Sequence, residues 1–457
     1  MRLPEKLLES LQGIKGFDKE AFEKVHATGG QLTSIRLNPT KFSEPLTALS
    51  FGNDLAGTVP WSDFGYYLNQ RPSFTFDPLF HAGCYYVQEA SSMCLEQALK
   101  QTTDLSQPLR ILDLAAAPGG KSTHIQSLIS HDSLLVSNEV IRSRSNILKD
   151  NIIKWGSDNV VVTNNDPKAF SRLENYFDVI VVDAPCSGSG LFRRDEEAIG
   201  EWSLNNVHLC SQRQQRIVSD VWSALKKNGV LIYATCSYSK EEDEAILEWM
   251  HSTLSIANCP LSIDPAWGIT KIITDGGIEG YRFWPDKVKG EGFFLSCLRK
   301  MDGDLKNASR AKGKLEMLDR NGVQIINKWV KGTDHVYAKI QDKVYALPEK
   351  LIHEINVMIN NLHVIYTGVM AGELIREKLI PSHELAMSSL IGPEIEKIDL
   401  NYEEAITYLK KKDLSEVNTG KGWRLVHHKN HPLGWINILQ NRINNYYPKE
   451  LRILKDI

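Results

Sequence analysis

Short apolar runs alternate with longer helical or loop-like stretches between residues 109 and 300. The runs cover residues 109–114, 134–137, 160–163, 177–182 and 229–234. They are unbroken and rich in Val, Ile and Leu, which is typical of parallel strands buried on both faces. The pattern therefore predicts an α/β core built on a parallel sheet. A later run, 292–298, predicts a further strand at the edge of that sheet.

The flanking regions have different patterns. Residues 1–105 combine helical patterns with a short strand-like piece at 33–39, and residues 87–99 are predicted to form an amphipathic helix. Residues 301–318 are rich in Lys, Asp, Gly and Asn, which is typical of a linker. Beyond it, short β-like pieces at 335–338 and 363–366 predict small, strand-rich structure.

Length and composition narrow the class of protein. A chain of 457 residues predicts roughly three or four domains. A hydrophobic content of 42% and a charged content of 24% are ordinary for a soluble globular protein. A net charge of −3 argues against a surface that is basic throughout, although it permits a local basic patch.

The cysteine usage and the N-terminal segment predict a cytoplasmic protein. Seven cysteines without a Cys-x-x-Cys pair fit free thiols in a reducing compartment better than disulfides or a zinc site, and we expect no metal. The charged start of the chain does not resemble a signal peptide. The sequence also holds no run of 18 apolar residues, so we expect no membrane partner.

The first strand of the core leads into a turn that suits a cofactor. Small residues and two glycines in Ala115–Lys121 let backbone N–H groups approach a ligand closely, at the start of a helix. The string Gly-Gly-Lys-Ser invites comparison with a phosphate-binding loop. That motif requires a glycine where this chain has Ala115, which argues against a nucleotide-phosphate site.

Two acidic residues follow the next two strands. Glu139 comes after residues 134–138, close to the ~20-residue spacing at which an acid binds ribose hydroxyls. Asp166 comes after residues 160–165, where it could contact an adenine ring. Either acid alone would suit an exposed loop, but the two together indicate a ligand that contains adenosine.

Two cysteines stand at the ends of the last two core strands. Cys186 follows the run 177–182 and Cys236 follows the run 229–234. Ligands of open α/β sheets bind outside the carboxyl ends of the strands, so both thiols are predicted to face one pocket, together with Asp183. Thiolates are effective nucleophiles, which suggests covalent chemistry. For the remaining cysteines we expect a packing role: Cys84, Cys94, Cys210, Cys259 and Cys297.

These motifs, in this order and spacing, resemble the Sun/nucleolar-protein family of RNA cytosine-C5 methyltransferases. The resemblance covers roughly residues 1–300 and rests on these strings: Asp-Leu-Ala-Ala-Ala-Pro-Gly-Gly-Lys, Asp-Ala-Pro-Cys-Ser-Gly-Ser-Gly, Ala-Thr-Cys-Ser-Tyr, Val-Gln-Glu-Ala-Ser-Ser-Met, Arg-Leu-Asn and Glu-Gly-Phe-Phe. The tail, with His-Pro-Leu-Gly-Trp at 431–435, is similar to the C-terminal extension of bacterial 16S ribosomal RNA methyltransferases of the F type.

The resemblance implies a Rossmann-like, S-adenosylmethionine-dependent core with an N-terminal α+β extension and small β-rich, PUA-like RNA-binding domains at the C-terminus. It divides the chain into an N-terminal RNA-binding extension (1–105), a catalytic core (106–302), a linker (303–318), a connecting domain (319–380) and a PUA-like domain (381–457). We expect a monomer that acts on RNA, with 16S ribosomal RNA or the small ribosomal subunit as its substrate.

The resemblance also implies roles for individual residues. Cys236 would attack carbon 6 of cytosine, and Cys186 would help to release the product. Asp183 would contact both the cofactor and the cytosine, whereas Lys121 would either orient groups near the base or belong to the cofactor turn. The residues implied to line S-adenosylmethionine are Ala115, Ala116, Ala117, Pro118, Gly119, Gly120, Lys121, Glu139, Asp166 and Asp183.

Alternatives to this interpretation remain. The chain could methylate transfer RNA, methylate DNA with Cys186 as the nucleophile, or bind RNA without catalysis on a methyltransferase scaffold. From Gly420 onward, seven Lys/Arg residues are interleaved with Trp423, Trp435, Tyr446 and Tyr447. This mixture fits an RNA-binding surface. It fits equally a small β-barrel with a solvated charged face.

Overall fold

A ten-stranded sheet forms the centre of the computed structural model, which describes residues 3–28, 30, 32–43, 49, 54–303, 315–414 and 420–455. Its strand order is β11-β12-β13-β9-β8-β5-β6-β7-β17, and β10 pairs with β13. The parallel strands are β5 (Arg110–Asp113), β6 (Leu134–Asn138), β7 (Val160–Thr163), β8 (Phe177–Asp183) and β9 (Leu225–Thr235). The antiparallel strands are β10 (Ile256–Asn258), β11 (Thr270–Ile273), β12 (Glu279–Phe283), β13 (Phe293–Lys300) and β17 (Val364–Thr367).

The predicted parallel core is confirmed, but the prediction that the run 292–298 forms an edge strand is wrong. That run becomes β13, which lies between β12 and β9 because a β11–β12 hairpin pairs outside it. Most of the predicted linker, residues 304–314, lies outside the described residues.

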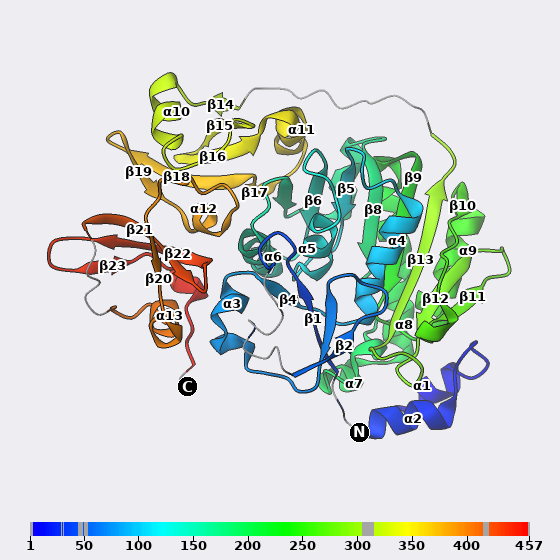
Figure 1. Ribbon diagram of the computed structural model, residues 1–457. Helices are drawn as coiled ribbons and strands as arrows, with labels where there is room; N and C mark the ends of the chain where they lie inside the picture. Colours follow the sequence, from blue (N-terminus) through cyan, green and yellow to red (C-terminus); the bar gives the residue numbers. More distant parts are fainter. Residues whose placement is uncertain are drawn as a thin grey trace.

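Helices cover both faces of this sheet (Figure 1). One face packs against α4 (Leu95–Thr102), α5 (Gly120–Gln126) and α6 (Arg142–Trp155), and the other against α8 (Leu204–Val221), α9 (Glu244–Thr253) and α11 (Ile352–Asn361). Neighbouring strand residues enter opposite cores, as Ile111 and Leu112 do. Because both faces are buried, the strands need apolar residues at every position.

The predicted helix over 87–99 is wrong in its first half. Strand β4 (Tyr85–Val87) comes first, a 3-10 turn covers Ser91–Cys94, and α4 begins only at Leu95. The Gln88 N–H donates to the Ser34 carbonyl at 3.2 Å, which keeps the chain extended. The Glu89 carboxylate then accepts hydrogen bonds from the N–H groups of Ser91 and Ser92, each at 2.9 Å, and caps the turn.

The N-terminal region forms a small sheet that is attached to the core by a buried arginine. Its elements are α1 (Glu5–Ser10), α2 (Lys19–Ala27), β1 (Thr33–Leu37), β2 (Leu55–Thr58), β3 (Gly65–Leu68), α3 (Pro78–His81) and β4, with the sheet order β2-β3-β1-β4. Arg36, fully buried in β1, donates to Thr123 Oγ1 at 2.7 Å and to the Gly120 carbonyl at 3.3 Å. The small sheet is thereby fixed against the beginning of α5.

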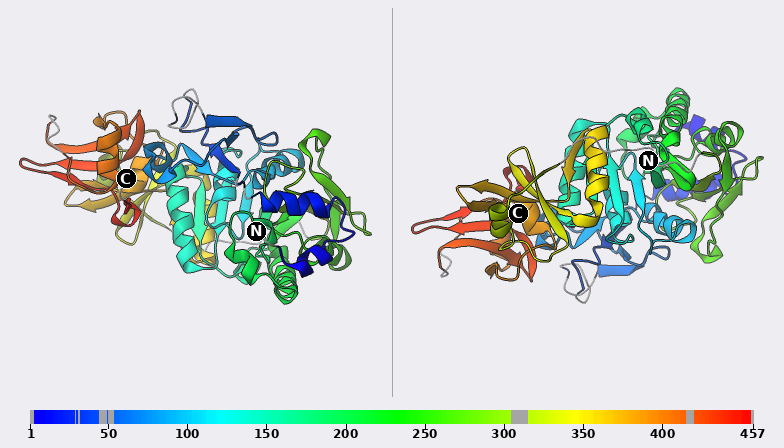
Figure 2. Two further views of the ribbon diagram at one scale, coloured as in Figure 1. Left: turned by 90° about the horizontal axis from the view of Figure 1, so that it is seen from below. Right: turned by 90° about the horizontal axis from the view of Figure 1, so that it is seen from above.

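The C-terminal region lies at one end of the elongated molecule, and α1 and α2 lie toward the other end (Figure 2). One of its sheets contains β14 (Glu316–Met317), β15 (His335–Ile340), β16 (Lys343–Pro348), β18 (Val369–Ile375) and β19 (Lys378–Pro381), next to α10 (Arg320–Ile326) and α12 (His383–Met387). The other contains β20 (Lys397–Asp399), β21 (Gly422–His428), β22 (His431–Ile438) and β23 (Ile443–Asn445), next to α13 (Tyr402–Leu409).

This C-terminal region is not an independent attachment. Its strand β17 pairs with β7 and completes the central sheet, while α11 packs on the core. The second sheet shares a hydrophobic cluster with the N-terminal region, in which Leu37 and Phe42 join Leu400 and Leu433. Removal of the tail would therefore expose apolar surface of both other regions. Within the described residues, no helix is long and apolar enough to span a membrane.

Candidate active site

The ends of β5, β8 and β9 lie next to one another at the carboxyl edge of the central sheet. In the register, Asp113 pairs with Val181, and Asp183 pairs with Ala234. In the sheet, β5 lies between β6 and β8. The chain runs from β5 to β6 on one side of β5, and β8 pairs with β5 on its other side. Such a reversal of strand order opens a crevice that commonly binds ligands. The structure thus places the turn after β5 and the loops with the two cysteines at one edge.

The two rim cysteines are in direct contact. Cys186 Sγ lies 3.0 Å from Cys236 Sγ, and both residues are partly exposed. The hydrogen bond to Cys236 raises the pKa of Cys186 well above its ordinary value, and burial and the charges of Cys236 and Glu242 act in the same direction. The raised pKa favours the protonated form of Cys186, and the S–H of either cysteine can donate in the contact between the two sulfurs.

The other five cysteines are buried: Cys84, Cys94, Cys210, Cys259 and Cys297. The predicted packing role is confirmed for the four that belong to hydrophobic clusters, whereas Cys210 lies outside them and its Sγ donates to Asn206 Oδ1 at 3.7 Å. Burial raises the pKa of Cys297 well above its ordinary value, and burial likewise raises the pKa of Cys94. Buried, protonated thiols of this kind behave as small apolar side chains.

Lys121 and Asp183 form an ion pair beside the thiols. Lys121 Nζ lies 2.6 Å from Asp183 Oδ2, and it also lies 5.3 Å from the centre of the Phe293 ring. Burial, the largest single effect, lowers the pKa of Lys121, but the charge and hydrogen bond of Asp183, together with smaller effects of neighbouring groups, raise the pKa above its ordinary value. Lys121 thus remains a cation that faces Asp183 across the crevice, and Asp183 is available as a hydrogen-bond acceptor.

A cavity of about 240 Å³ adjoins the predicted cofactor turn. Gly119 adopts φ +114°, which lets the chain turn into α5 at little steric cost. A Cβ on Gly120 would lie 3.4 Å from Tyr86 and would narrow the cavity. The residues that line it are Tyr86, Val87, Gln88, Glu89, Ser92, Ala115, Ala116, Ala117, Pro118, Gly120, Lys121, Asp183 and Arg194.

Beneath the turn lies Asp113, a residue for which the sequence predicted no role in the site. Its Oδ2 accepts from Ser122 Oγ at 2.7 Å, while its Oδ1 is buried without a partner among the described residues. Burial raises the pKa of Asp113 to about 7, and the charges of Asp183 and Glu139 add to the shift. The only sequence signal for it was its place at the end of an apolar run.

The structure places Glu139 and Asp166 after β6 and β7, but neither lines the 240 Å³ cavity. Glu139 is buried, and its Oε1 accepts from the Ile141 N–H at 2.9 Å. Asp166 is exposed and caps a 3-10 turn by accepting from the Lys168 N–H at 3.0 Å. Both carboxylates therefore have local structural partners as well as positions near the crevice.

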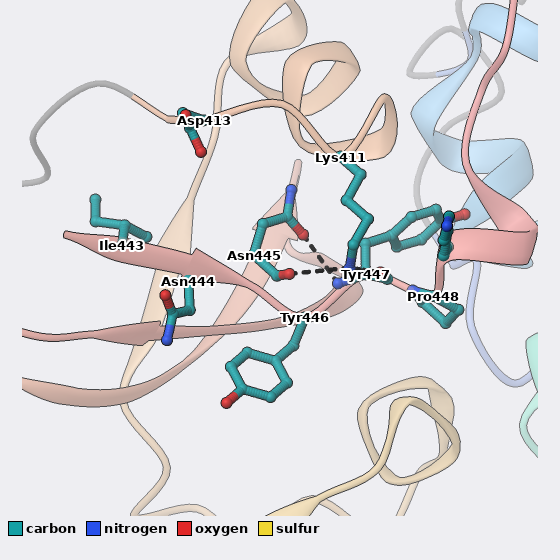
Figure 3. Close-up of a pocket in the computed structure, with 9 residues that line it drawn as sticks. Lys411, Asp413, Ile443, Asn444, Asn445, Tyr446, Tyr447 and Pro448 are labelled. Atoms are coloured by element: carbon teal, nitrogen blue, oxygen red, sulfur yellow. Dashed lines mark hydrogen bonds between the residues drawn. The ribbon is translucent and has the colours of Figure 1, made fainter.

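The aromatic residues of the tail divide into buried and accessible ones. Trp435 and Tyr447 are buried in hydrophobic clusters, and Arg424 is paired with Glu396 at 2.6 Å. The Trp423 and Tyr446 rings remain partly exposed and lie 4.4 Å apart. Figure 3 shows Tyr446 beside a hollow of about 510 Å³, which is also lined by Lys411, Asn444, Asn445 and Lys449.

Comparison with known families gives matches along most of the chain. Residues 3–90 match the N-terminal domain of 16S rRNA methyltransferase RsmF, residues 100–299 match 16S rRNA methyltransferase RsmB/F, and residues 395–453 match the methyltransferase RsmF PUA domain.

Curated relatives match over nearly their whole length. A protein of Vibrio atlanticus (strain LGP32) named ribosomal RNA small subunit methyltransferase F is 30% identical over 92% of this chain and 90% of its own length. A Vibrio parahaemolyticus protein of the same name is 29% identical over 98% of this chain and 97% of its own.

Solved structures resemble about two thirds of the chain. A methyltransferase homolog from Pyrococcus horikoshii is 26% identical, covers 65% of this chain and 100% of its own, and has a TM-score of 0.51. NSun6 from the same organism, solved with SFG, is 20% identical over 66% of this chain and 99% of its own, with a TM-score of 0.53. The latter likeness concerns the fold alone. The predicted methyltransferase core with RsmF-type terminal regions is confirmed.

Proposed function

This chain belongs to the 16S rRNA methyltransferase RsmB/F family, and from that premise we propose that it methylates carbon 5 of a cytosine through a covalent bond to Cys236. Membership makes it an S-adenosylmethionine-dependent methyltransferase of ribosomal RNA. The target carbon, the covalent intermediate and the choice of 16S ribosomal RNA or the assembled small subunit belong to the proposal.

The contact between the two thiols carries this proposal. Carbon 5 of cytosine is a poor nucleophile, and it becomes reactive when a thiolate adds to carbon 6. Cys186 Sγ lies 3.0 Å from Cys236 Sγ, and the contact with Cys236 and burial raise the pKa of Cys186 well above its ordinary value, so Cys186 is the poorer source of a thiolate. This asymmetry supports Cys236 as the nucleophile and Cys186 as the residue that acts after methyl transfer.

Asp183 and Lys121 are proposed to orient the base. Because Lys121 lies 2.6 Å from Asp183, the carboxylate is held as an acceptor, which suits the exocyclic amine of cytosine. The Lys121 ammonium in turn places positive charge beside the ring where the adduct gains electron density. After methyl transfer, loss of the carbon-5 proton and departure of Cys236 complete the reaction. The base must first leave its stack or come from single-stranded RNA.

The residues around the crevice fit the cofactor. S-adenosylmethionine, when bound, supplies an electrophilic methyl group on a positively charged sulfur. Glu139 and Asp183 lie close enough to Asp113 for their charges to raise its pKa, and the negative charge of these two carboxylates favours such a cation. We propose that Glu139 binds the ribose hydroxyls of S-adenosylmethionine and that Asp166 approaches its adenine. Backbone groups of Ala115–Lys121 and the side chain of Asp183 would contact the rest of the cofactor.

The tail is proposed to bind RNA through its accessible groups. Tyr446 and Trp423 can stack on unpaired bases, and Tyr446, Lys411 and Lys449 line the hollow of about 510 Å³ (Figure 3). The match to a PUA domain over residues 395–453 supports this assignment.

The central test replaces each thiol in turn. Cys236→Ala should abolish methyl transfer to ribosomal RNA and leave cofactor binding nearly intact, because the thiol lies outside Ala115–Lys121. Cys186→Ala should accumulate a protein–RNA adduct that migrates slowly on denaturing gels, and the double variant should lose it. Cys259→Ala, which changes a buried cysteine outside the rim, serves as the control.

The outcomes also separate the alternatives. Substantial turnover by Cys236→Ala would refute the assignment, and loss of turnover with an adduct through Cys186 would reverse the two roles. Tritiated methyl transfer should be compared among 16S ribosomal RNA, small subunits, transfer RNA and DNA. Bisulfite mapping of ribosomal RNA from a deletion strain would then identify the cytosine.

A further inference from the structure

One buried carboxylate contacts both of the loops that carry the thiols. Glu242 ends a 3-10 turn that follows β9. Its Oε1 accepts from the Ser187 N–H at 2.7 Å, and its Oε2 accepts from Ser187 Oγ at 2.6 Å and from Ser237 Oγ at 2.5 Å. Ser187 directly follows Cys186, and Ser237 directly follows Cys236.

A second side chain extends this contact to the other side of Cys186. Gln214 on α8 is fully buried, and its Nε2 donates to the Pro185 carbonyl at 3.1 Å and to Glu242 Oε1 at 3.4 Å. Hydrogen bonds therefore fix the residues on both sides of Cys186: Pro185 through Gln214, and Ser187 through Glu242. The Glu242 carbonyl accepts from the Tyr233 hydroxyl at 2.7 Å, which anchors the turn to β9.

The charge of Glu242 is unfavourable for a nearby thiolate. Burial raises the pKa of Glu242, while its serine and glutamine donors act against that shift. The carboxylate is also one cause of the raised pKa of Cys186. A positively charged neighbour would lower the pKa of a thiol, whereas the charge of Glu242 acts in the opposite direction on Cys186. Glu242 is therefore suited to fixing geometry and to keeping Cys186 protonated.

We propose that Glu242 is a positioning residue that clamps the two thiol loops together and holds Cys186 in contact with Cys236. The proposal rests on the proposed use of both thiols in catalysis, and it adds the device that aligns them. Misplacement of reacting groups by about 1 Å can lower a rate on the order of 100-fold, so the clamp would matter for turnover.

The first measurement needs no RNA and is therefore independent of the proposed reaction. Diamide removes one hydrogen from each of two neighbouring thiols, forms a disulfide between them and is itself reduced to the hydrazine. In the full-length protein, peptide mapping should detect a Cys186–Cys236 disulfide. Its rate of formation, compared at equal ionisation of Cys186, should fall at least about tenfold in Glu242→Ala and less in Glu242→Gln, which keeps one carbonyl acceptor. Glu241→Gln, the same change at a neighbouring, partly exposed position, should leave the rate unchanged.

The second measurement uses ribosomal RNA. In Glu242→Gln the methyl-transfer rate should fall about tenfold or more at saturating RNA, while the affinity for S-adenosylmethionine stays within about twofold. Alkylation of Cys186 should also shift to lower pH, because a charge that raises its pKa has been removed. A residue that only stabilises the fold would lower the melting temperature without moving this pH profile.

The clamp is refuted if a folded Glu242→Ala protein forms the disulfide at the wild-type rate well below its melting temperature. If that variant does not fold, Ser187→Ala and Ser237→Ala, which each remove one hydroxyl donor, decide the question by the same assay. Turnover by Cys236→Ala would instead overturn the proposed reaction, and the diamide result would still judge the clamp.

Discussion

Replacing Lys121 by methionine should distinguish between the two roles that the sequence left open for it. The change removes the ammonium group and keeps an unbranched apolar side chain of similar length. In the structure, Lys121 Nζ contacts Asp183 Oδ2 at 2.6 Å and lies 5.3 Å from the centre of the Phe293 ring, so its ammonium group points toward Asp183, where we propose that the base binds. We therefore expect Lys121→Met to impair methyl transfer and to preserve cofactor binding.

The expected size of the effect follows from the ion pair. A hydrogen bond between charged groups contributes about 1.5–3 kcal/mol, and each 1.4 kcal/mol is about tenfold in an equilibrium or rate ratio. The Asp183 side chain is 34% exposed, so water compensates part of the loss. We expect kcat/KM to fall about 10- to 30-fold, near the lower end of that range.

Three measurements test this expectation. Calorimetry gives the affinity for S-adenosylmethionine, and single-turnover transfer to ribosomal RNA gives the chemical rate. A double-mutant cycle with Asp183→Asn should give a strongly non-additive result, because either single change already breaks the pair. Lys226→Met is a matched control, since Lys226 pairs with Asp178 at the opposite end of β8 and β9.

Two results would refute the reasoning. A large loss of cofactor affinity with normal transfer at saturating cofactor would assign Lys121 to the cofactor turn. Additive effects of Lys121→Met and Asp183→Asn would mean that the ion pair does not act as a unit in the reaction.

Three further predictions follow from the structure. Glu139→Ala should weaken S-adenosylmethionine binding at least about tenfold by calorimetry, because it removes a charged acceptor, whereas unchanged binding would make Glu139 an ordinary loop acid. The pKa of Asp113 is ordinarily 3.8 and is about 7 in the folded protein, so between these pH values the folded state keeps a proton that the unfolded chain has lost. The free energy of unfolding should therefore fall by at most about 4 kcal/mol as pH rises from 3.8 to about 7, and it should level off above that range. Asp113→Asn should remove this pH dependence of the unfolding free energy, measured by urea titration at several pH values. Deleting residues 319–457 should lower the melting temperature and weaken cofactor binding together, because β17 and the hydrophobic cluster shared with the N-terminal region are lost; a stable deletion variant with normal cofactor affinity would contradict this expectation. Tyr446→Ala should weaken only RNA binding, by about 1–3 kcal/mol, and an unchanged RNA affinity of this variant would contradict its stacking role.

The sequence alone identified the elements whose signals are local. Unbroken apolar runs predicted the parallel strands, because a strand that is buried on both faces needs apolar residues throughout. The small residues of Ala115–Lys121 predicted a tight turn, and Gly119 does adopt a positive φ there. The positions of Cys186 and Cys236 after two strands predicted a shared rim, because parallel strands end at one edge.

Some predictions from local sequence pattern were wrong because a capping side chain, a distant strand or tertiary packing determined the structure instead. The carboxylate of Glu89 caps a turn inside the segment predicted to be one helix. A hairpin outside residues 293–300 moved a predicted edge strand to the interior of the sheet. In the tail, Trp435 and Tyr447 looked like RNA-stacking residues, yet they fill hydrophobic clusters. Periodicity does not tell a buried aromatic ring from an accessible one.

Contacts between distant residues were decided only by the tertiary structure. Lys121 and Asp183 are separated by 62 residues, Cys186 and Cys236 by 50, and Glu242 and Ser187 by 55. Glu242 lies within a run of four acidic residues, which by itself predicts a solvated surface, yet it is buried between the thiol loops. β17 begins at Val364 and completes the sheet beside β7, which ends at Thr163, 201 positions earlier. The local sequence determines which helix, strand or turn each segment can form. The folding of the whole chain determines which charges, thiols and strand edges meet, because these groups come together only when distant segments pack and bury one another.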